Sequence, residues 1–188
     1  MQQIDIKTVT LADAEELQKI SRQTFYETFS AQNTAANMKK YLAENLSLAK
    51  LSAELKDKNA EFYFACSGGQ VIGYLKINTG TSQTVLQDEQ SLEIERIYVV
   101  TAYHGKKVGQ LLLEKALQRA KQQNAGYVWL GVWEQNSKAI QFYKKNGFVG
   151  FDKHIFKLGD DEQTDIMMKK NLPLTPAVEN KYVHEDPV

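Results

Sequence analysis

The pattern of hydrophobic and polar positions in the first part of the chain predicts one strand followed by helices. Apolar and polar residues alternate over residues 4–9, which is typical of a strand with one buried face. Thr10 begins a capping-box pattern, and apolar residues then follow at near-helical spacing. Thr34 and Ser47 are typical N-caps of two further short helices.

Residues 61–77 have the pattern of a β-hairpin. Two strand-like runs, 61–67 and 71–77, are separated by Gly68 and Gly69, a pair that favours a tight turn. Cys66 falls within the first run, where we expect it to be a small core residue.

The remaining pattern alternates between strands and helices. The expected elements are a strand at 91–100, a helix at 108–122, a near-continuous apolar strand at 127–133, a helix at 136–146, and two strands at 148–157 and 164–170 around a turn at 159–161. We expect the apolar strand to be central, and Val108, Leu111, Leu112, Ala116 and Ala120 to share one helix face. The strand–helix–strand unit implies one right-handed parallel crossover in an otherwise largely antiparallel α/β sheet.

Composition narrows the classes of protein to consider. The 188 residues are 43% hydrophobic and carry 23 basic and 23 acidic side chains, so a generic nucleic-acid or anionic-membrane binder is disfavoured. One cysteine excludes an intrachain disulfide, and the three histidines are too scattered for a local metal motif. No apolar run approaches the roughly 18 residues of a membrane span. We expect a soluble cytoplasmic protein without a metal, with one domain over 1–172 and a polar tail over 173–188.

The strand at 91–100 has an irregular pattern. Its apolar positions are even-numbered up to 94 and odd-numbered from 97, so a regular strand would send them to opposite faces. A bulge near residues 95–96 would bring them to one face and leave backbone N–H groups unpaired. A strand buried on both faces is the alternative, and spacing alone does not separate the two.

Two segments that follow have the composition of binding elements. Residues 103–109, Tyr-His-Gly-Lys-Lys-Val-Gly, precede a helix, where free amides and the helix dipole favour an anion; an ordinary loop with solvated lysines is the alternative. Asn136 and Tyr143 are seven residues apart, two helical turns or about 10 Å, so both lie on one face of the last helix. A cap and a core tyrosine would give the same spacing.

Together these elements resemble the GCN5-related N-acetyltransferase (GNAT) superfamily over roughly residues 4–170. The most specific segments are 91–123 and 136–148, the latter reading Asn-x-x-Ala-x-x-Phe-Tyr-x-x-x-Gly-Phe. Residues 91–98, 129–134 and 159–165 are similar to PaiA-type polyamine N-acetyltransferases. The resemblance implies a three-layer fold with a mixed, mostly antiparallel sheet of about six or seven strands flanked by helices.

The resemblance also implies transfer of an acetyl group from acetyl-CoA to a primary amine such as spermidine or spermine. Tyr143 would protonate the leaving thiolate, and an amide near Ile97 would bind the thioester oxygen. The residues that would hold acetyl-CoA are Ile97, Tyr98, Val99, His104, Gly105, Lys106, Lys107, Val108, Gly109, Gln110, Asn136, Lys138 and Tyr143. The family loop is Gln/Arg-x-x-Gly-x-Gly/Ala; here His104 occupies the first position and Lys107 replaces the first glycine.

The acceptor side is less defined by the sequence. Glu95 or Glu93 would accept the proton of the amine through water, although both acids also fit a solvated strand. Glu27 and Glu134 are further acids that could receive a polycation. A protein, peptide or other small amine remains an alternative acceptor, as do a non-catalytic acetyl-CoA-binding regulatory protein and a homodimer.

Overall fold

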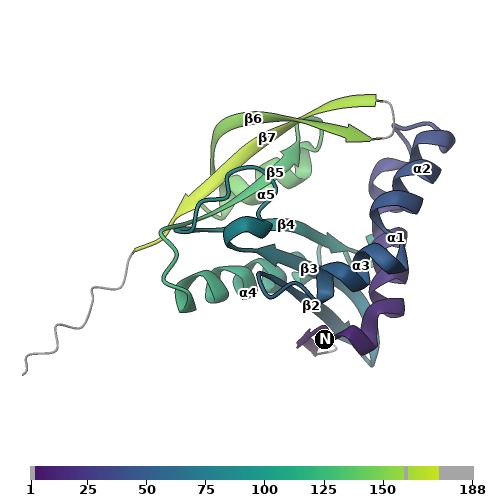
Figure 1. Ribbon diagram of the computed structural model, residues 1–188, viewed down its shortest axis with the longest axis horizontal. Helices are drawn as coiled ribbons and strands as arrows, with labels where there is room; N and C mark the ends of the chain where they lie inside the picture. Colours follow the sequence, from purple (N-terminus) through teal and green to yellow (C-terminus); the bar gives the residue numbers. More distant parts are fainter. Residues whose placement is uncertain (1–2, 159–160, 174–188) are drawn as a thin grey trace, which may run out of the picture.

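The computed structural model describes residues 3–158 and 161–173 (Figure 1), so most of the predicted turn at 159–161 and of the predicted tail at 173–188 lies outside it. One seven-stranded sheet has the order β1-β2-β3-β4-β5-β7-β6. Its strands are β1 (Ile4–Thr8), β2 (Ala60–Ser67), β3 (Gln70–Asn78), β4 (Ser91–Val99), β5 (Tyr127–Trp133), β6 (Val149–Leu158) and β7 (Asp161–Asn171). The β4–β5 pair is parallel and the other neighbouring pairs are antiparallel, which confirms the predicted mixed α/β sheet.

Helices cover both faces of the sheet and give three layers. The helices are α1 (Ala14–Phe29), α2 (Ala35–Asn45), α3 (Leu48–Leu55), α4 (Val108–Gln122) and α5 (Ser137–Lys145). One hydrophobic cluster joins α4 and α5 to one face of the sheet, and a second cluster joins α1, α2 and α3 to the other (Figure 1). Buried Cys66 belongs to the second cluster, as predicted for a small core residue.

The predicted helix starts are present. The side chains of Thr34 and Ser47 each accept a hydrogen bond from the backbone of the residue three positions on, at 3.2 Å in both cases. Thr10 and Asp13 form the predicted capping box, which opens a short 3-10 turn before α1.

Two expectations about the core need adjustment. In α4 the buried leucines are Leu112 and Leu113, because the helix turns Leu113 onto the sheet and leaves the predicted Leu111 half-exposed at the edge. Strand β5 is central, as predicted, but Gly131 is exposed within it.

The strand register shows that β4 contains a bulge, which was one of the two alternatives left open by the sequence. Lys76 pairs with Arg96 and Ile77 pairs with Ile94, so Glu95 has no partner residue on β3. The extra residue returns the apolar residues on both sides of the bulge to the face covered by α4.

Strands β4 and β5 separate soon after they meet. Their parallel pairing covers only residues 91–93 of β4 against residues 127–129 of β5. Beyond this point the edge of β4 that faces β5 carries no strand partner, and this opening positions the site described next.

Candidate active site

A cavity of about 1540 Å³ occupies the opening between β4 and β5 and extends across the sheet. It reaches elements far apart in the sequence, from α1 near the N-terminus to β7. The predicted site residues that line it are Glu93, Glu95, Ile97, Tyr98, Val99, His104, Gly105, Lys107, Val108, Gly109, Gln110, Asn136, Lys138 and Tyr143. Lys106 does not line it; its ammonium group lies over the Tyr103 ring, 4.8 Å from the centroid.

The exposed edge of β4 offers backbone groups to an extended ligand. The Val100 N–H donates to the Ile72 carbonyl at 2.9 Å, and ladder bonds in an antiparallel pair recur at every second residue. The backbone of Tyr98 therefore faces β3, whereas the N–H and C=O groups of Ile97 and Val99 face the opening. The Val99 carbonyl accepts a hydrogen bond from His104 Nε2 at 2.8 Å, which leaves the Ile97 groups and the Val99 N–H directed into the cavity.

The loop before α4 has the backbone of an anion site. Gly105 and Lys107 adopt left-handed conformations, with φ of 74° and 65°. Lys107 is the N-cap of α4, so the first free amides of this 15-residue helix border the cavity. The lysine at the family's glycine position thus keeps the left-handed conformation that glycine favours and adds a positive charge to the helix start.

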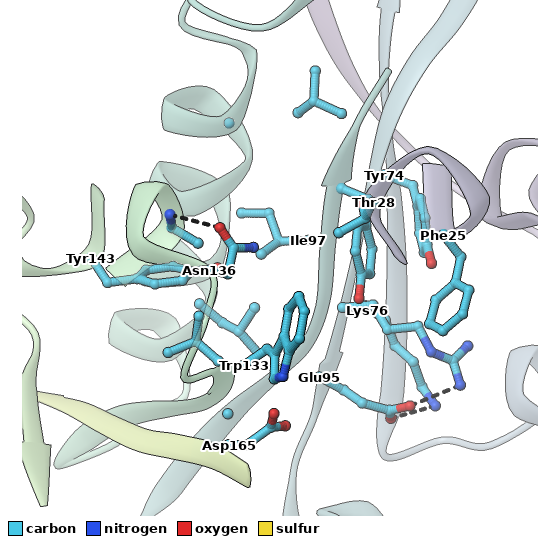
Figure 2. A pocket seen from close by; sticks show the side chains of 18 of the residues that line it. Phe25, Thr28, Tyr74, Lys76, Glu95, Ile97, Trp133, Asn136, Tyr143 and Asp165 are labelled. Atoms are coloured by element: carbon cyan, nitrogen blue, oxygen red, sulfur yellow. Dashed lines mark hydrogen bonds and ion pairs between the residues drawn. The ribbon is translucent and has the colours of Figure 1, made fainter. Parts of the chain in front are cut away.

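Helix α5 brings Asn136 and Tyr143 to the same cavity, as their spacing predicts (Figure 2). Asn136 caps the helix, with its Oδ1 accepting from the Ala139 N–H at 3.1 Å. The Tyr143 ring is buried between Phe142 and Phe148. Burial raises the pKa of Tyr143 above its ordinary value, so the hydroxyl stays protonated over the whole neutral range.

Glu95 belongs to a buried network of alternating charges. Its carboxylate lies 2.5 Å from Lys76 Nζ and 2.8 Å from Arg96, and Asn78 also donates to it at 2.6 Å. Glu54 of α3 closes the network by pairing with the same two cations, at 3.0 Å and 2.8 Å. Burial alone would raise the pKa of Glu95, but the charges of Arg96 and Lys76 outweigh it and leave the pKa lowered.

The other acids considered from the sequence also have partners. The carboxylate of Glu93 is buried and accepts from Asn78 at 3.0 Å and from the backbone N–H of Thr84 at 2.9 Å; burial raises its pKa against these bonds. Glu27 accepts from the backbone and the hydroxyl of Thr101, both at 2.8 Å. Glu134 lies 3.6 Å from Lys153 on the surface.

The comparisons with known proteins agree with this geometry. Residues 15–148 match the family model described as Acetyltransferase (GNAT) family. An uncharacterised N-acetyltransferase from the pepI 3′ region of Lactobacillus delbrueckii subsp. lactis is 38% identical over 90% of this chain and 98% of its own. The chain belongs to the GNAT acetyltransferase family. It is accordingly an acetyl-CoA-dependent N-acetyltransferase.

More distant relatives have the same fold. The crystal structure of the PaiA N-acetyltransferase of Thermoplasma acidophilum in complex with coenzyme A superposes with a TM-score of 0.74 at 24% identity, covering 90% of this chain and 99% of that one. A spermidine N(1)-acetyltransferase of the same organism is 26% identical over 89% of this chain and 96% of its own. The three-layer GNAT fold expected from the sequence is thereby confirmed.

None of the described helices is both long and apolar enough to cross a bilayer. Within residues 3–158 and 161–173, no group of three or more His, Cys, Asp or Glu side chains is placed to hold a metal ion.

Sequence reasoning missed an aromatic wall on the side of the cavity that α1, α2 and β6 form. The rings of Phe25 (α1) and Tyr41 (α2) stack at 4.2 Å, and Phe156 (β6) meets Tyr41 edge-on at 5.7 Å. Trp133 (β5) approaches Phe29 (α1) at 5.9 Å. Because these rings come from four elements, the sequence carries no local signal for their meeting.

Sequence reasoning also missed a carboxylate. Asp165 of β7 is half-buried at the cavity, opposite Trp133 in the sheet register. Its position is plain in Figure 2, where it lies below the Trp133 ring. The one sequence feature that could have pointed to Asp165 was its place in the segment 159–165, which is similar to PaiA-type enzymes.

Proposed function

We propose that this enzyme acetylates a primary amine of a small polycationic alkylamine, a polyamine such as spermidine, with Tyr143 as general acid. The observation that carries the proposal is the opening between β4 and β5, where the backbone groups of Ile97 and the N–H of Val99 face one cavity together with Tyr143. The cavity has a cofactor side formed by β4, α4 and α5, and an acceptor side formed by α1, α2, β6 and β7.

On the cofactor side, the backbone of Ile97 and Val99 would pair with the amides of the pantetheine arm as a neighbouring strand does. The free amides at the start of α4, with Lys107, would hold the pyrophosphate. The Ile97 N–H, just after the bulge, would bind the thioester oxygen as negative charge develops on it.

Tyr143 would act when the carbon–sulfur bond breaks. Its raised pKa keeps the proton on the hydroxyl in the resting enzyme, so the residue can donate but cannot serve as the base. The ordinary pKa of a thiol is about 8.5, so the sulfur that leaves as a thiolate takes up a proton at neutral pH, and the Tyr143 hydroxyl would supply it inside the cavity.

The acceptor side suits a cationic chain. Aromatic faces attract ammonium groups and also contact methylene segments, and polyamines alternate these two chemical units. The distant spermidine acetyltransferase relative is consistent with this class of acceptor.

A thiol-release assay against spermidine, spermine, aminoglycosides and lysine peptides tests the acceptor. We expect the highest kcat/KM with a polyamine. Higher activity on a peptide would indicate a protein acceptor in place of a polyamine. The absence of turnover with every amine would refute the proposed function.

Replacing Tyr143 with Phe tests the acid. We expect kcat to fall about 100-fold, the lower range for general acid catalysis, with little change in acetyl-CoA affinity by calorimetry. Tyr26→Phe is the matched control, because Tyr26 is 57% exposed. An unchanged kcat in Tyr143→Phe would remove the acid role.

A further inference from the structure

Asp165 is the carboxylate of the cavity that has no partner in the described chain. Within residues 3–158 and 161–173 it accepts no hydrogen bond and forms no ion pair, although it is half-buried. Partial burial of an anion without a partner costs free energy, and a cation bound in the cavity would offset that cost.

The backbone makes room for this carboxylate. A Cβ atom added to Gly131 of β5 would stand 3.2 Å from Asp165 Oδ2, closer than an ordinary contact. Gly131 and Asp165 both line the cavity, so the missing side chain gives the carboxylate its place beside β5 and its access to the cavity.

We propose that Asp165 binds the ammonium group of the acceptor amine and takes a proton from it before attack. This inference rests on the proposed function, because it concerns the amine that the enzyme acetylates. It assigns proton uptake to Asp165 in place of the sequence-predicted Glu95 or Glu93.

The chemistry of the three carboxylates favours this assignment. Glu95 is paired with two cations, Lys76 and Arg96, so it binds a proton weakly. Its negative charge is already compensated and would attract an ammonium group little. The carboxylate of Glu93 already accepts hydrogen bonds from Asn78 and Thr84. Asp165 is open on the cavity side, and the Trp133 ring beside it supplies an aromatic face for the same cation (Figure 2).

The proton balance of the reaction is simple. The ammonium group gives one proton to Asp165, and the neutral amine attacks the thioester carbonyl carbon. A carbon–nitrogen bond forms, the carbon–sulfur bond breaks, and the sulfur takes a proton from Tyr143. The nitrogen releases a second proton to water, water reprotonates Tyr143, and Asp165 returns its proton to solvent. The products are the N-acetylamine, the CoA thiol and one proton.

The surroundings of Asp165 suit a base that works near neutral pH. Burial raises the pKa of Asp165 to about 6, and the charge of His154, opposite it on β6, acts against this rise. The facing residues of β5, Gly131 and Trp133, carry no charge. A base of this strength is mostly ionised at pH 7 and still accepts a proton effectively.

The test is Asp165→Asn, with spermidine as the probe amine and release of CoA thiol as the readout. We expect kcat/KM for spermidine to fall about 100-fold, and the acid limb of its pH profile near pH 6 to disappear. Glu162→Gln, an exposed position on the same strand, is the control and should match the wild type. Calorimetry should give the same acetyl-CoA affinity within about twofold in all three proteins, which also shows that the variant is folded.

Gly131→Ala tests the position of the carboxylate without removing it. We expect a several-fold loss of kcat/KM in the wild type and no further loss in Asp165→Asn, because both changes act through one group. Equal losses in both backgrounds would mean that the added methyl group blocks the cavity by itself, and would contradict the positioning argument.

The outcomes separate the two proposals. An active wild type with an equally active Asp165→Asn overturns the role of Asp165 alone. A wild type that binds acetyl-CoA but acetylates no amine overturns the proposed function on which it rests.

Discussion

Two carboxylates line the same cavity of this GNAT enzyme and differ in what surrounds them. Glu95 meets Lys76, Arg96 and Asn78, and its pKa is lowered. Asp165 meets no partner in the described chain, and burial raises its pKa to about 6. Burial raises the pKa of both groups, but the two cations beside Glu95 outweigh burial, whereas the charge of His154 opposes it only in part at Asp165. The difference shows that the partners of a carboxylate, more than its place in the cavity, decide whether it holds the fold or exchanges a proton.

The largest effect that would test this comparison is loss of stability in Glu95→Gln. Removing one member of a buried ion-pair network leaves opposite charges uncompensated, so we expect a loss of about 3 kcal/mol in the free energy of unfolding at pH 7. Urea unfolding measures it. Glu162→Gln removes an exposed pair with Lys157 and should change the free energy by less than about 0.5 kcal/mol. Equal losses in the free energy of unfolding for the two variants would mean that the network does not stabilise the fold.

Asp165→Asn should change the free energy of unfolding in the opposite direction, as a gain in stability, and by a smaller amount. A raised pKa means that the folded state binds the proton more tightly than the unfolded state, so stability falls as pH rises toward about 6. Above that pH the ionised carboxylate destabilises the fold, and the amide should stabilise it by about 1 kcal/mol at pH 8. Urea unfolding at pH 8 and at pH 4 checks this, because the gain should shrink at the lower pH. A variant less stable than the wild type at pH 8 would contradict an unpaired Asp165.

Glu134→Gln should have the smallest effect. Glu134 pairs with Lys153 on the surface at 3.6 Å and does not line the cavity. We expect stability to change by less than about 0.5 kcal/mol, and KM for spermidine by less than about twofold. A large rise in KM would show that the polycation extends beyond the cavity to this surface acid.

Much of the cofactor side could be predicted because its signals are local. The change of parity in β4 made a bulge near Glu95 one of two possibilities, which the strand register then decided. The spacing of Asn136 and Tyr143 placed both on one face of α5. Away from the cofactor side, the caps of α2 and α3, Thr34 and Ser47, were also readable because a cap is a local signal.

The acceptor side could not be predicted because its contacts join distant segments. Whether Glu95 is free depends on Lys76 of β3 and on Glu54 of α3. The position of Asp165 depends on the register that sets β7 against β5 and on the missing side chain of Gly131. A sequence shows that acids are present but not which cations reach them.

The different roles of Asp165 and Glu95 can be tested directly by an NMR pH titration of their side-chain carboxyl carbons, with Asp165→Asn and Glu95→Gln to assign the signals. We expect Asp165 to titrate near pH 6, Glu95 to titrate below the ordinary range of a glutamate, and spermidine to shift the Asp165 signal. A Glu95 that titrates near pH 6 while Asp165 titrates at an ordinary aspartate value would contradict these roles.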